Sequence, residues 1–123
     1  MLIDNIKKLE AIRQIAYDIH CYFGVGFLEK VYENALSHRL QNAGFDVKTQ
    51  VPIVVKDEDG FVVGNYEADI MVDNQIIIEL KTAQTLTNAH KAQLLNYLKA
   101  TGIKQGLLIN FGSEKFQIKS FIY

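Results

Sequence analysis

Two charged residues stand inside an apolar run near the middle of the chain. Glu79 and Lys81 interrupt the segment IIIELK at residues 76–81. In a β-strand, side chains two residues apart point to the same face, so this carboxylate and this ammonium group should be neighbours. Burying such charges is costly unless they pair or bind a cation. A structural ion pair or a solvated strand face would also explain them, because short motifs give many false positives.

A further acidic residue, Asp69, lies on the preceding strand-like segment, EADIMV at residues 67–72. In an antiparallel hairpin, a two-residue turn at Asp73-Asn74 would pair Asp69 with Ile78 and put the two carboxylates on opposite faces. A three-residue loop, or one bulge, would pair Asp69 with Glu79. We predict this second register. The other face of the hairpin is then a hydrophobic layer of Ile70, Val72, Ile76, Ile78 and Leu80.

Two carboxylates this close repel each other unless a divalent cation lies between them. Oxygen ligands suit Mg²⁺ (or Mn²⁺), which accepts one or two protein carboxylates together with water and substrate phosphate. A bound cation lowers the pKa of a water and neutralises charge on a phosphodiester, and a lysine can orient that water or stabilise developing negative charge. Asp69, Glu79 and Lys81 are therefore the candidate catalytic centre of a metal-dependent phosphodiester hydrolase.

The expected second helix carries Glu29, Tyr32, Glu33 and Leu36 along one stripe at three- and four-residue spacing. Glu29 falls beside apolar neighbours and is a candidate for an additional metal or water ligand that reaches towards Asp69. The alternative for Glu29 is a first-turn glutamate favoured by the helix dipole. Glu33 is expected at the solvent boundary.

A similar polar stripe, formed by His90, Gln93 and Tyr97, lies on the expected third helix. It is either a solvated helix face or a set of hydrogen-bonding groups that line a cleft. In the second case Gln93 and Tyr97 could hold a phosphate or the lysine. The residues of this helix that remain available to the core are Leu94, Leu95 and Leu98.

The hydrophobic pattern predicts the elements that position these side chains. Helical spacing predicts helices at residues 6–23, 27–42 and 88–101. Alternating or continuous apolar runs predict strands at residues 47–55, 61–72, 75–82, 106–110 and 116–122. The almost entirely apolar third segment is expected at the centre of a sheet covered on both faces. Pro52 predicts that the first strand lies at an edge or carries a bulge, because proline has no N–H for a ladder.

This element order, α-α-β-β-β-α-β-β, predicts an α/β fold in which a mixed β-sheet is flanked by helices. The 123 residues fit a single domain, residues 1–123, with 49% hydrophobic and 22% charged residues. The formal net charge of −1 excludes the class of strongly basic nucleic-acid-binding proteins. Any contact with nucleic acid must come from a local basic patch, a bound cation or a partner.

Cysteine usage and hydropathy indicate where such a protein works. The single cysteine, Cys21, excludes an internal disulfide and suits a reducing cytoplasm. Its place on a core-like helix favours an inert thiol. The amino terminus lacks the apolar stretch of a signal peptide, and no window is long and apolar enough for a membrane span, so we expect a cytoplasmic protein with no membrane partner.

Five sequence blocks together resemble one family. GFLEKVY at residues 26–32 matches the GxxExxY signature that names a branch of the PD-(D/E)xK nuclease superfamily. Ala68-Asp69, IELK at 78–81, QLLNYL at 93–98 and LLINFG at 107–112 resemble the remaining blocks in order. The resemblance covers nearly the whole chain, and its specificity comes from the order and spacing of the blocks together.

The resemblance implies a restriction-endonuclease-like core with Asp69, Glu79 and Lys81 as the metal and water centre. It adds Glu29 as the acidic residue of a helix and Gln93 as a polar residue of a later helix. Ala68 takes the place of the proline that gives the superfamily its name. Because a proline there shapes backbone and supplies no ligand, this departure leaves the expected chemistry intact.

The leading hypothesis is a magnesium-dependent deoxyribonuclease with Asp69, Glu79 and Glu29 as metal ligands. The expected substrate contacts are Tyr97, His90 and Tyr32. One alternative is a non-catalytic nucleic-acid-binding or assembly module, such as a homodimer or part of a larger complex, which the small size and near-neutral charge favour. Another is a hydrolase acting on a smaller phosphodiester or nucleotide, which would need less basic surface.

Overall fold

The computed structural model describes residues 2–123, with side chains described from Asn5 onwards. The helices are α1 (Leu2–Phe23), α2 (Glu29–Asn42) and α3 (Asn88–Thr101). The strands are β1 (Val47–Lys56), β2 (Val62–Val72), β3 (Ile76–Lys81), β4 (Gln105–Asn110) and β5 (Gln117–Ile122). This order confirms the predicted α/β fold with a mixed sheet. Within the described residues, no helix has the length and apolar character needed to cross a membrane.

The sheet has the strand order β1-β2-β3-β4-β5, so β3 is its central strand. Neighbouring strands are antiparallel except for β3 and β4, which are parallel. A parallel pair needs a crossover connection, and α3 supplies it. Every residue of β3 except Lys81 is buried, as predicted for a strand covered on both faces. The predicted edge position of the strand that carries Pro52 is also confirmed.

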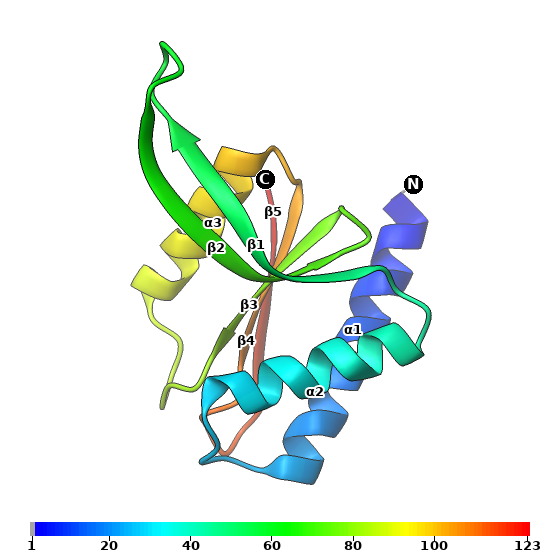
Figure 1. The fold of residues 1–123 in the computed structure, drawn as a ribbon. Helices are drawn as coiled ribbons and strands as arrows, with labels where there is room; N and C mark the ends of the chain where they lie inside the picture. The colour runs from blue at the N-terminus through cyan, green and yellow to red at the C-terminus, as the bar shows by residue number, and fades with distance from the viewer. Residues whose placement is uncertain (1) are drawn as a thin grey trace.

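Helices cover both faces of the sheet, with α1 and α2 on one side and α3 on the other (Figure 1). On the first side, Ile12, Ala16 and Ile19 of α1 recur at helical spacing and pack on the predicted hydrophobic layer of β2 and β3. All five residues of that layer belong to this core. The second core joins Leu94 and Leu98 of α3 to the opposite face of the sheet.

Two side chains assigned to core-like positions lie outside the core. Leu95 is 36% exposed because the stripe of α3 that meets the sheet consists of Leu94, Tyr97 and Leu98. Cys21 is exposed. It follows Ile19 by two residues, about 200° around the helix axis, so it points away from the buried stripe. An apolar residue on an amphipathic helix need not face its buried side, so the prediction that Leu95 is available to the core is wrong. That the Cys21 thiol is inert stays a prediction.

The loop between β2 and β3 sets the register of the hairpin. The paired residues are Ile70 with Ile78, Met71 with Ile77, and Val72 with Ile76. Three residues therefore form the loop, and its first two have left-handed backbone angles, with φ of 53° and 54°. Those two are an aspartate and an asparagine, which tolerate this conformation better than most residues. The predicted three-residue loop and even register are confirmed.

The carboxyl end of β3, which carries Lys81, is held by the end of β4. Phe111 donates its backbone N–H to the Lys81 carbonyl over 2.9 Å. The fully buried Asn110 accepts the backbone N–H groups of Ala83 and Gly112 through Oδ1, over 3.0 and 2.9 Å. Its Nδ2 donates to the Ala83 carbonyl over 2.9 Å. The chain on both sides of Lys81 is thereby fixed to the neighbouring strand.

This close approach requires a glycine at position 112. A Cβ atom there would lie 2.3 Å from the backbone carbonyl carbon of Thr82, whereas a Cβ at Gly106 would meet only the side chain of Leu94, at 2.9 Å. Backbone cannot move aside as readily as the end of a leucine. We therefore expect Gly112→Ala to lower the free energy of unfolding by about 2 kcal/mol or more in denaturant titrations.

Gly106→Ala is the matched control for this substitution, because it adds the same methyl group at another position near β4. We expect it to cost less than Gly112→Ala, since Leu94 can change its rotamer. Equal losses for the two variants would contradict the proposed contact between residue 112 and the end of β3.

Candidate active site

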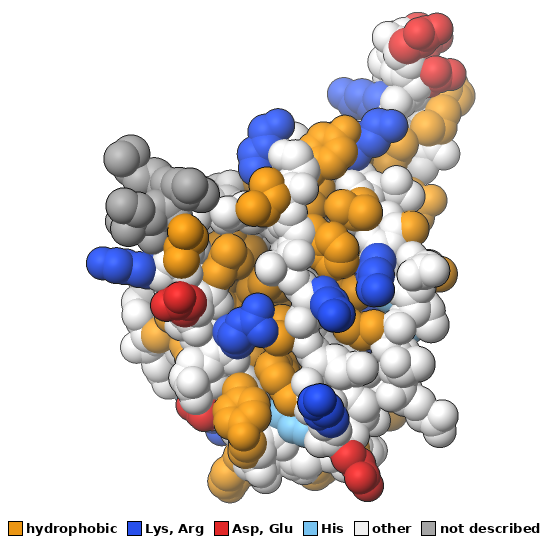
Figure 2. All heavy atoms as spheres, turned by 180° about the vertical axis from the view of Figure 1, so that it is seen from behind, with side chains coloured by type: hydrophobic (Ala, Val, Ile, Leu, Met, Phe, Trp, Pro, Cys, Tyr) orange, Lys and Arg blue, Asp and Glu red, His pale blue; other side chains and the backbone are white. Residues whose placement is uncertain are grey.

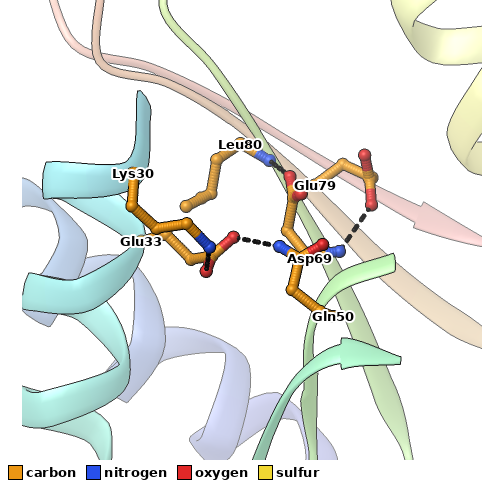
Figure 3. A network of polar contacts seen from close by, with 6 residues as sticks. All are labelled: Lys30, Glu33, Gln50, Asp69, Glu79 and Leu80. Carbon is orange, nitrogen blue, oxygen red and sulfur yellow. Dashed lines mark hydrogen bonds and ion pairs between the residues drawn. The ribbon is translucent and has the colours of Figure 1, made fainter. Parts of the chain in front are cut away.

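The acidic residues lie where β2 and β3 stop pairing. The ladder ends at Ile70 and Ile78, and beyond it the Asp69 N–H donates to Glu79 Oε1 over 3.0 Å. In return, the Leu80 N–H donates to Asp69 Oδ2 over 2.8 Å (Figure 3). Carboxylate oxygens thus take the place of ladder carbonyls. Within the described residues, the second oxygen of each carboxylate makes no hydrogen bond, so it is available to a ligand.

Both strands beside Asp69 are irregular. Gln50 and Asp69 stand opposite each other in β1 and β2 without pairing, although their neighbours on both sides pair. Gln50 has a left-handed backbone with φ of 50°. Ala68 packs on the α3 side of the sheet while Ile70 packs on the α1 and α2 side, although residues two apart in a regular strand share a face. This break in alternation leaves Asp69 free to reach across to Leu80.

Burial and mutual repulsion make this acidic cluster electrostatically unfavourable. Glu79 is only 4% exposed, and burial raises its pKa to about 8, with the charge of Asp69 adding to the rise. The Asp69 N–H and the Lys81 ammonium group oppose the change. Burial also raises the pKa of Asp69 and of Glu29, and at Glu29 the charge of Asp69 adds to it. A cation among these groups would relieve the repulsion.

The lysine is held by the polar stripe of α3. Lys81 Nζ donates to Gln93 Oε1 over 2.9 Å, and Gln93 Nε2 donates to the Tyr97 hydroxyl over 3.1 Å. Burial raises the pKa of Tyr97, and the nearby charge of Glu79 adds to this. Gln93 thus holds the lysine directly, which is one of the two roles predicted for it, and Tyr97 holds Gln93.

Glu33 is buried, contrary to the prediction that it lies at the solvent boundary. It is 5% exposed, accepts a hydrogen bond from Gln50 Nε2 over 2.6 Å and forms an ion pair with Lys30 over 2.6 Å (Figure 3). The prediction failed because the crossing of α2 over β1 and β2 turns this part of the stripe towards the sheet. Glu33 and Gln50 thus support the strand beside Asp69, and the only sequence signal was Lys30 at three-residue spacing.

Tyr32 lies in the core, so the prediction that it contacts substrate is wrong. Its side chain is fully buried, and its ring stacks on Phe111 with centroids 4.7 Å apart. The hydroxyl donates to the Gly24 carbonyl over 2.6 Å and accepts the Phe27 N–H over 3.3 Å. These bonds close the loop between α1 and α2 and leave no part of the ring for a substrate.

His90 caps the amino terminus of α3. Its Nδ1 accepts the Thr87 N–H over 3.2 Å, and Thr87 Oγ1 accepts the His90 N–H over 3.2 Å. This reciprocal capping box accounts for the position of the imidazole without any ligand. A contact between His90 and substrate stays a prediction.

The three predicted metal ligands are not equally placed. In the part of the chain that the structure describes, no three His, Cys, Asp or Glu side chains converge closely enough to hold a metal ion. Asp69 and Glu79 lie together, whereas Glu29 stands apart in the first turn of α2, where burial and the charge of Asp69 raise its pKa and its own charge adds to the raised pKa of Glu79. Two carboxylates with free oxygens still fit Mg²⁺, which needs only one or two from the protein.

Comparison with known proteins identifies a family and a fold. The model of the PD-(D/E)XK nuclease superfamily matches residues 7–121. The crystal structure of SSO0001 is similar, with a TM-score of 0.59 and 22% sequence identity over 76% of this chain and 48% of that one. This chain therefore spans about half of that protein's length, and the likeness concerns the fold alone. None of the curated proteins matches.

The raised pKa of Glu79 predicts a pH-dependent stability. Its ordinary pKa is 4.5 and its folded value is about 8, so between these values the folded state binds more protons than the unfolded state. The free energy of unfolding must then fall as pH rises. In EDTA, denaturant titrations from pH 5 to 8.5 should lose on the order of a few kcal/mol from this group.

Glu79→Gln should remove most of this pH dependence, because the amide does not titrate. Glu58→Gln, at an exposed acidic position in the turn between β1 and β2, should leave it unchanged. A wild-type stability that stayed constant or rose across this pH range would disprove the protonation of Glu79 in the metal-free protein.

Proposed function

Because this chain belongs to the PD-(D/E)XK nuclease superfamily, we propose that it is a divalent-metal-dependent phosphodiesterase that cleaves DNA. The observation that carries the proposal is the reciprocal bonding of Asp69 and Glu79. It fixes two carboxylates side by side, leaves one oxygen of each available, and keeps both within electrostatic reach of Lys81. Two carboxylates that can hold a cation and a lysine that can stabilise negative charge suit metal-assisted hydrolysis of a phosphodiester.

Asp69 and Glu79 are the residues that would hold Mg²⁺ or Mn²⁺. When bound, such a cation neutralises charge on the phosphodiester and lowers the pKa of a coordinated water. The raised pKa values of Asp69, Glu79 and Glu29 support a cation at this position, because burial disfavours all three charged forms and the charge of Asp69 adds to the rise at the two glutamates. Glu29 is the candidate for a further contact to the cation or its water.

Lys81 is the group that we assign to the attacking water and to the negative charge that develops on the phosphate. Gln93 is a positioning residue, because it accepts a hydrogen bond from the ammonium group and is itself bonded to Tyr97. Fixing a long and flexible lysine in this way removes part of the entropy cost of orienting it during the reaction. The anchoring of the β3 end by Asn110 serves the same purpose for the backbone.

We also assign the chain to the GxxExxY branch of the superfamily, on residues 26–32. The structure supports a physical reason for each element of that motif. Gly26 has a left-handed backbone with φ of 108°, Glu29 begins α2, and Tyr32 binds Gly24 to close the loop. Together they determine where the helix starts and so where its first acidic side chain lies.

The second candidate function is a nucleic-acid-binding or assembly module without catalysis, such as a homodimer. The net charge of −1 favours it, because a small domain of this charge neutralises few phosphates. The two candidates differ in whether the protein turns over a phosphodiester in the presence of a divalent cation.

Cleavage of plasmid DNA and of single-stranded DNA tests the first candidate. With Mg²⁺ or Mn²⁺ the purified protein should nick or cut DNA, and EDTA should abolish this. Asp69→Ala and Lys81→Ala should each lower the cleavage rate by roughly 100-fold or more, because each removes a group that stabilises the transition state. Lys115→Ala, at an exposed position between β4 and β5, should cleave like the wild type.

Cleavage that survives both Asp69→Ala and Lys81→Ala would rule out this centre. Tight DNA binding without metal-dependent turnover would instead select the non-catalytic module. Cleavage restricted to small phosphodiesters or nucleotides would keep the chemistry and change the substrate.

Direct binding of Mn²⁺ separates the roles of the three acidic residues. In calorimetric or electron paramagnetic resonance titrations, Asp69→Asn and Glu79→Gln should weaken Mn²⁺ binding roughly tenfold or more. Glu29→Gln should have a smaller effect, because Glu29 stands apart from the pair. Glu10→Gln, an exposed acid on α1, is the matched control. Wild-type affinity in Glu79→Gln would show that the cation binds elsewhere.

A further inference from the structure

The hairpin of β1 and β2 projects beyond the rest of the fold, alongside α3 (Figure 1). A hollow of about 720 Å³ lies between the hairpin and the helix. It is lined by Val54, Val55, Lys56, Asn96, Lys99 and Ala100. None of these residues belongs to the candidate active site, and the hollow is large enough for a sizeable ligand.

The hollow and the candidate active site lie along one stripe of α3. Gln93, Asn96, Tyr97 and Ala100 follow one another at three- and four-residue spacing, so they share a helix face. Gln93 binds Lys81 at one end of this stripe, and Asn96 and Ala100 line the hollow at the other. A ligand lying in the hollow therefore extends towards the catalytic lysine.

An exposed aromatic ring stands between the two sites. Tyr66 of β2 is 51% exposed, and its ring centroid lies 5.8 Å from that of Tyr97. The ring lies over Gly64, where an added Cβ would be 3.1 Å from it. Contacts with Tyr97 and Gly64 hold the ring on one side and leave the rest of its surface to solvent. An aromatic ring that is held on one side and exposed on the other can stack with a planar ligand such as a nucleic-acid base.

Positive charges line the hollow, and negative charges lie at the tip of the hairpin. Lys56 and Lys99 contribute ammonium groups from opposite walls, and among the described residues neither forms an ion pair. The tip of the hairpin is acidic, with Asp57, Glu58 and Asp59 in the turn. Figure 2 shows these acidic side chains at the end of the projecting hairpin and basic ones below them. A polyanion is thus attracted to the hollow and repelled from the tip.

We propose that this hollow binds a single strand of nucleic acid and leads it to the active site. Lys56 and Lys99 bind its phosphates, and Tyr66 stacks with an unpaired base. The inference rests on the proposed nuclease function and specifies its substrate as single-stranded. Bases inside a duplex are already stacked on each other and cannot lie on Tyr66. A stacking surface with few cationic contacts also suits a chain whose net charge is −1.

Binding to labelled oligonucleotides in EDTA tests this proposal without turnover. By fluorescence anisotropy, oligothymidine should bind about tenfold more tightly than a DNA duplex of the same length. Tyr66→Leu should weaken binding to the single strand about tenfold, whereas Tyr66→Phe should keep it, because only the ring is needed for stacking. Comparison of oligouridine with oligothymidine distinguishes single-stranded RNA from single-stranded DNA. The polymer that binds more tightly is the preferred one.

The two lysines are tested by their effect on salt dependence. Lys56→Ala combined with Lys99→Ala should weaken binding of oligothymidine about tenfold. It should also reduce the slope of log affinity against log salt by about 1.4, since each phosphate contact on a single strand contributes about 0.7. Lys115→Ala with Lys119→Ala is the charge-matched control, and Tyr22→Leu, an exposed tyrosine of α1, is the aromatic control.

Duplex binding as tight as single-strand binding would overturn the proposal, as would no binding or equal losses in the control variants. The outcome is separate from that of the cleavage assay. A protein that binds single strands through Tyr66 and the two lysines but cleaves nothing supports the hollow and rejects the nuclease. One that cleaves DNA at the wild-type rate in all of these variants rejects the hollow alone.

Discussion

Everything at the candidate active site depends on an exchange of hydrogen bonds between two strands that have stopped pairing. Each of Asp69 and Glu79 uses one carboxylate oxygen to accept a backbone N–H from the opposite strand. The exchange satisfies donors that a regular ladder would satisfy with carbonyls. It also fixes the direction of both carboxylates with backbone geometry rather than with flexible side-chain partners. An acidic pair positioned in this way needs little reorganisation before it binds a ligand.

The same exchange also has an energetic cost for the folded protein. Burial disfavours the charged form of both carboxylates and raises the pKa of each, and at Glu79 the charge of Asp69 adds to the rise. Lys81 relieves part of it, but Gln93 holds the ammonium group towards α3. The electrostatic cost that remains is offset by the burial of apolar side chains in the two cores of the sheet. Local instability of this kind is common where a protein binds a charged ligand.

The parts of the structure that depend on local spacing were predictable from sequence. The helices, the strands and the register between Asp69 and Glu79 follow from hydrophobic period and turn chemistry. The burial of Glu33 and of Tyr32 was not predictable, because it depends on the angle at which α2 crosses the sheet. Asn110 escaped notice for a similar reason, since its four hydrogen bonds, to Ala83, Gly112 and Gln117, form only after β4 has paired with β3 and β5. Contacts between segments that are far apart in the chain leave no periodic pattern in the sequence.

The irregular segment of β1 has a consequence beyond the position of Asp69. β1 is an outer strand, and a long outer strand is a template on which another chain can add, the usual route to β-aggregation. Here Gln50 turns the backbone into a left-handed conformation, and Pro52 follows it without an N–H to offer. The open edge is thereby divided into short pieces. The left-handed residue Gln50, which stands opposite Asp69, thus also makes it less favourable for copies of the protein to associate through the edge of the sheet.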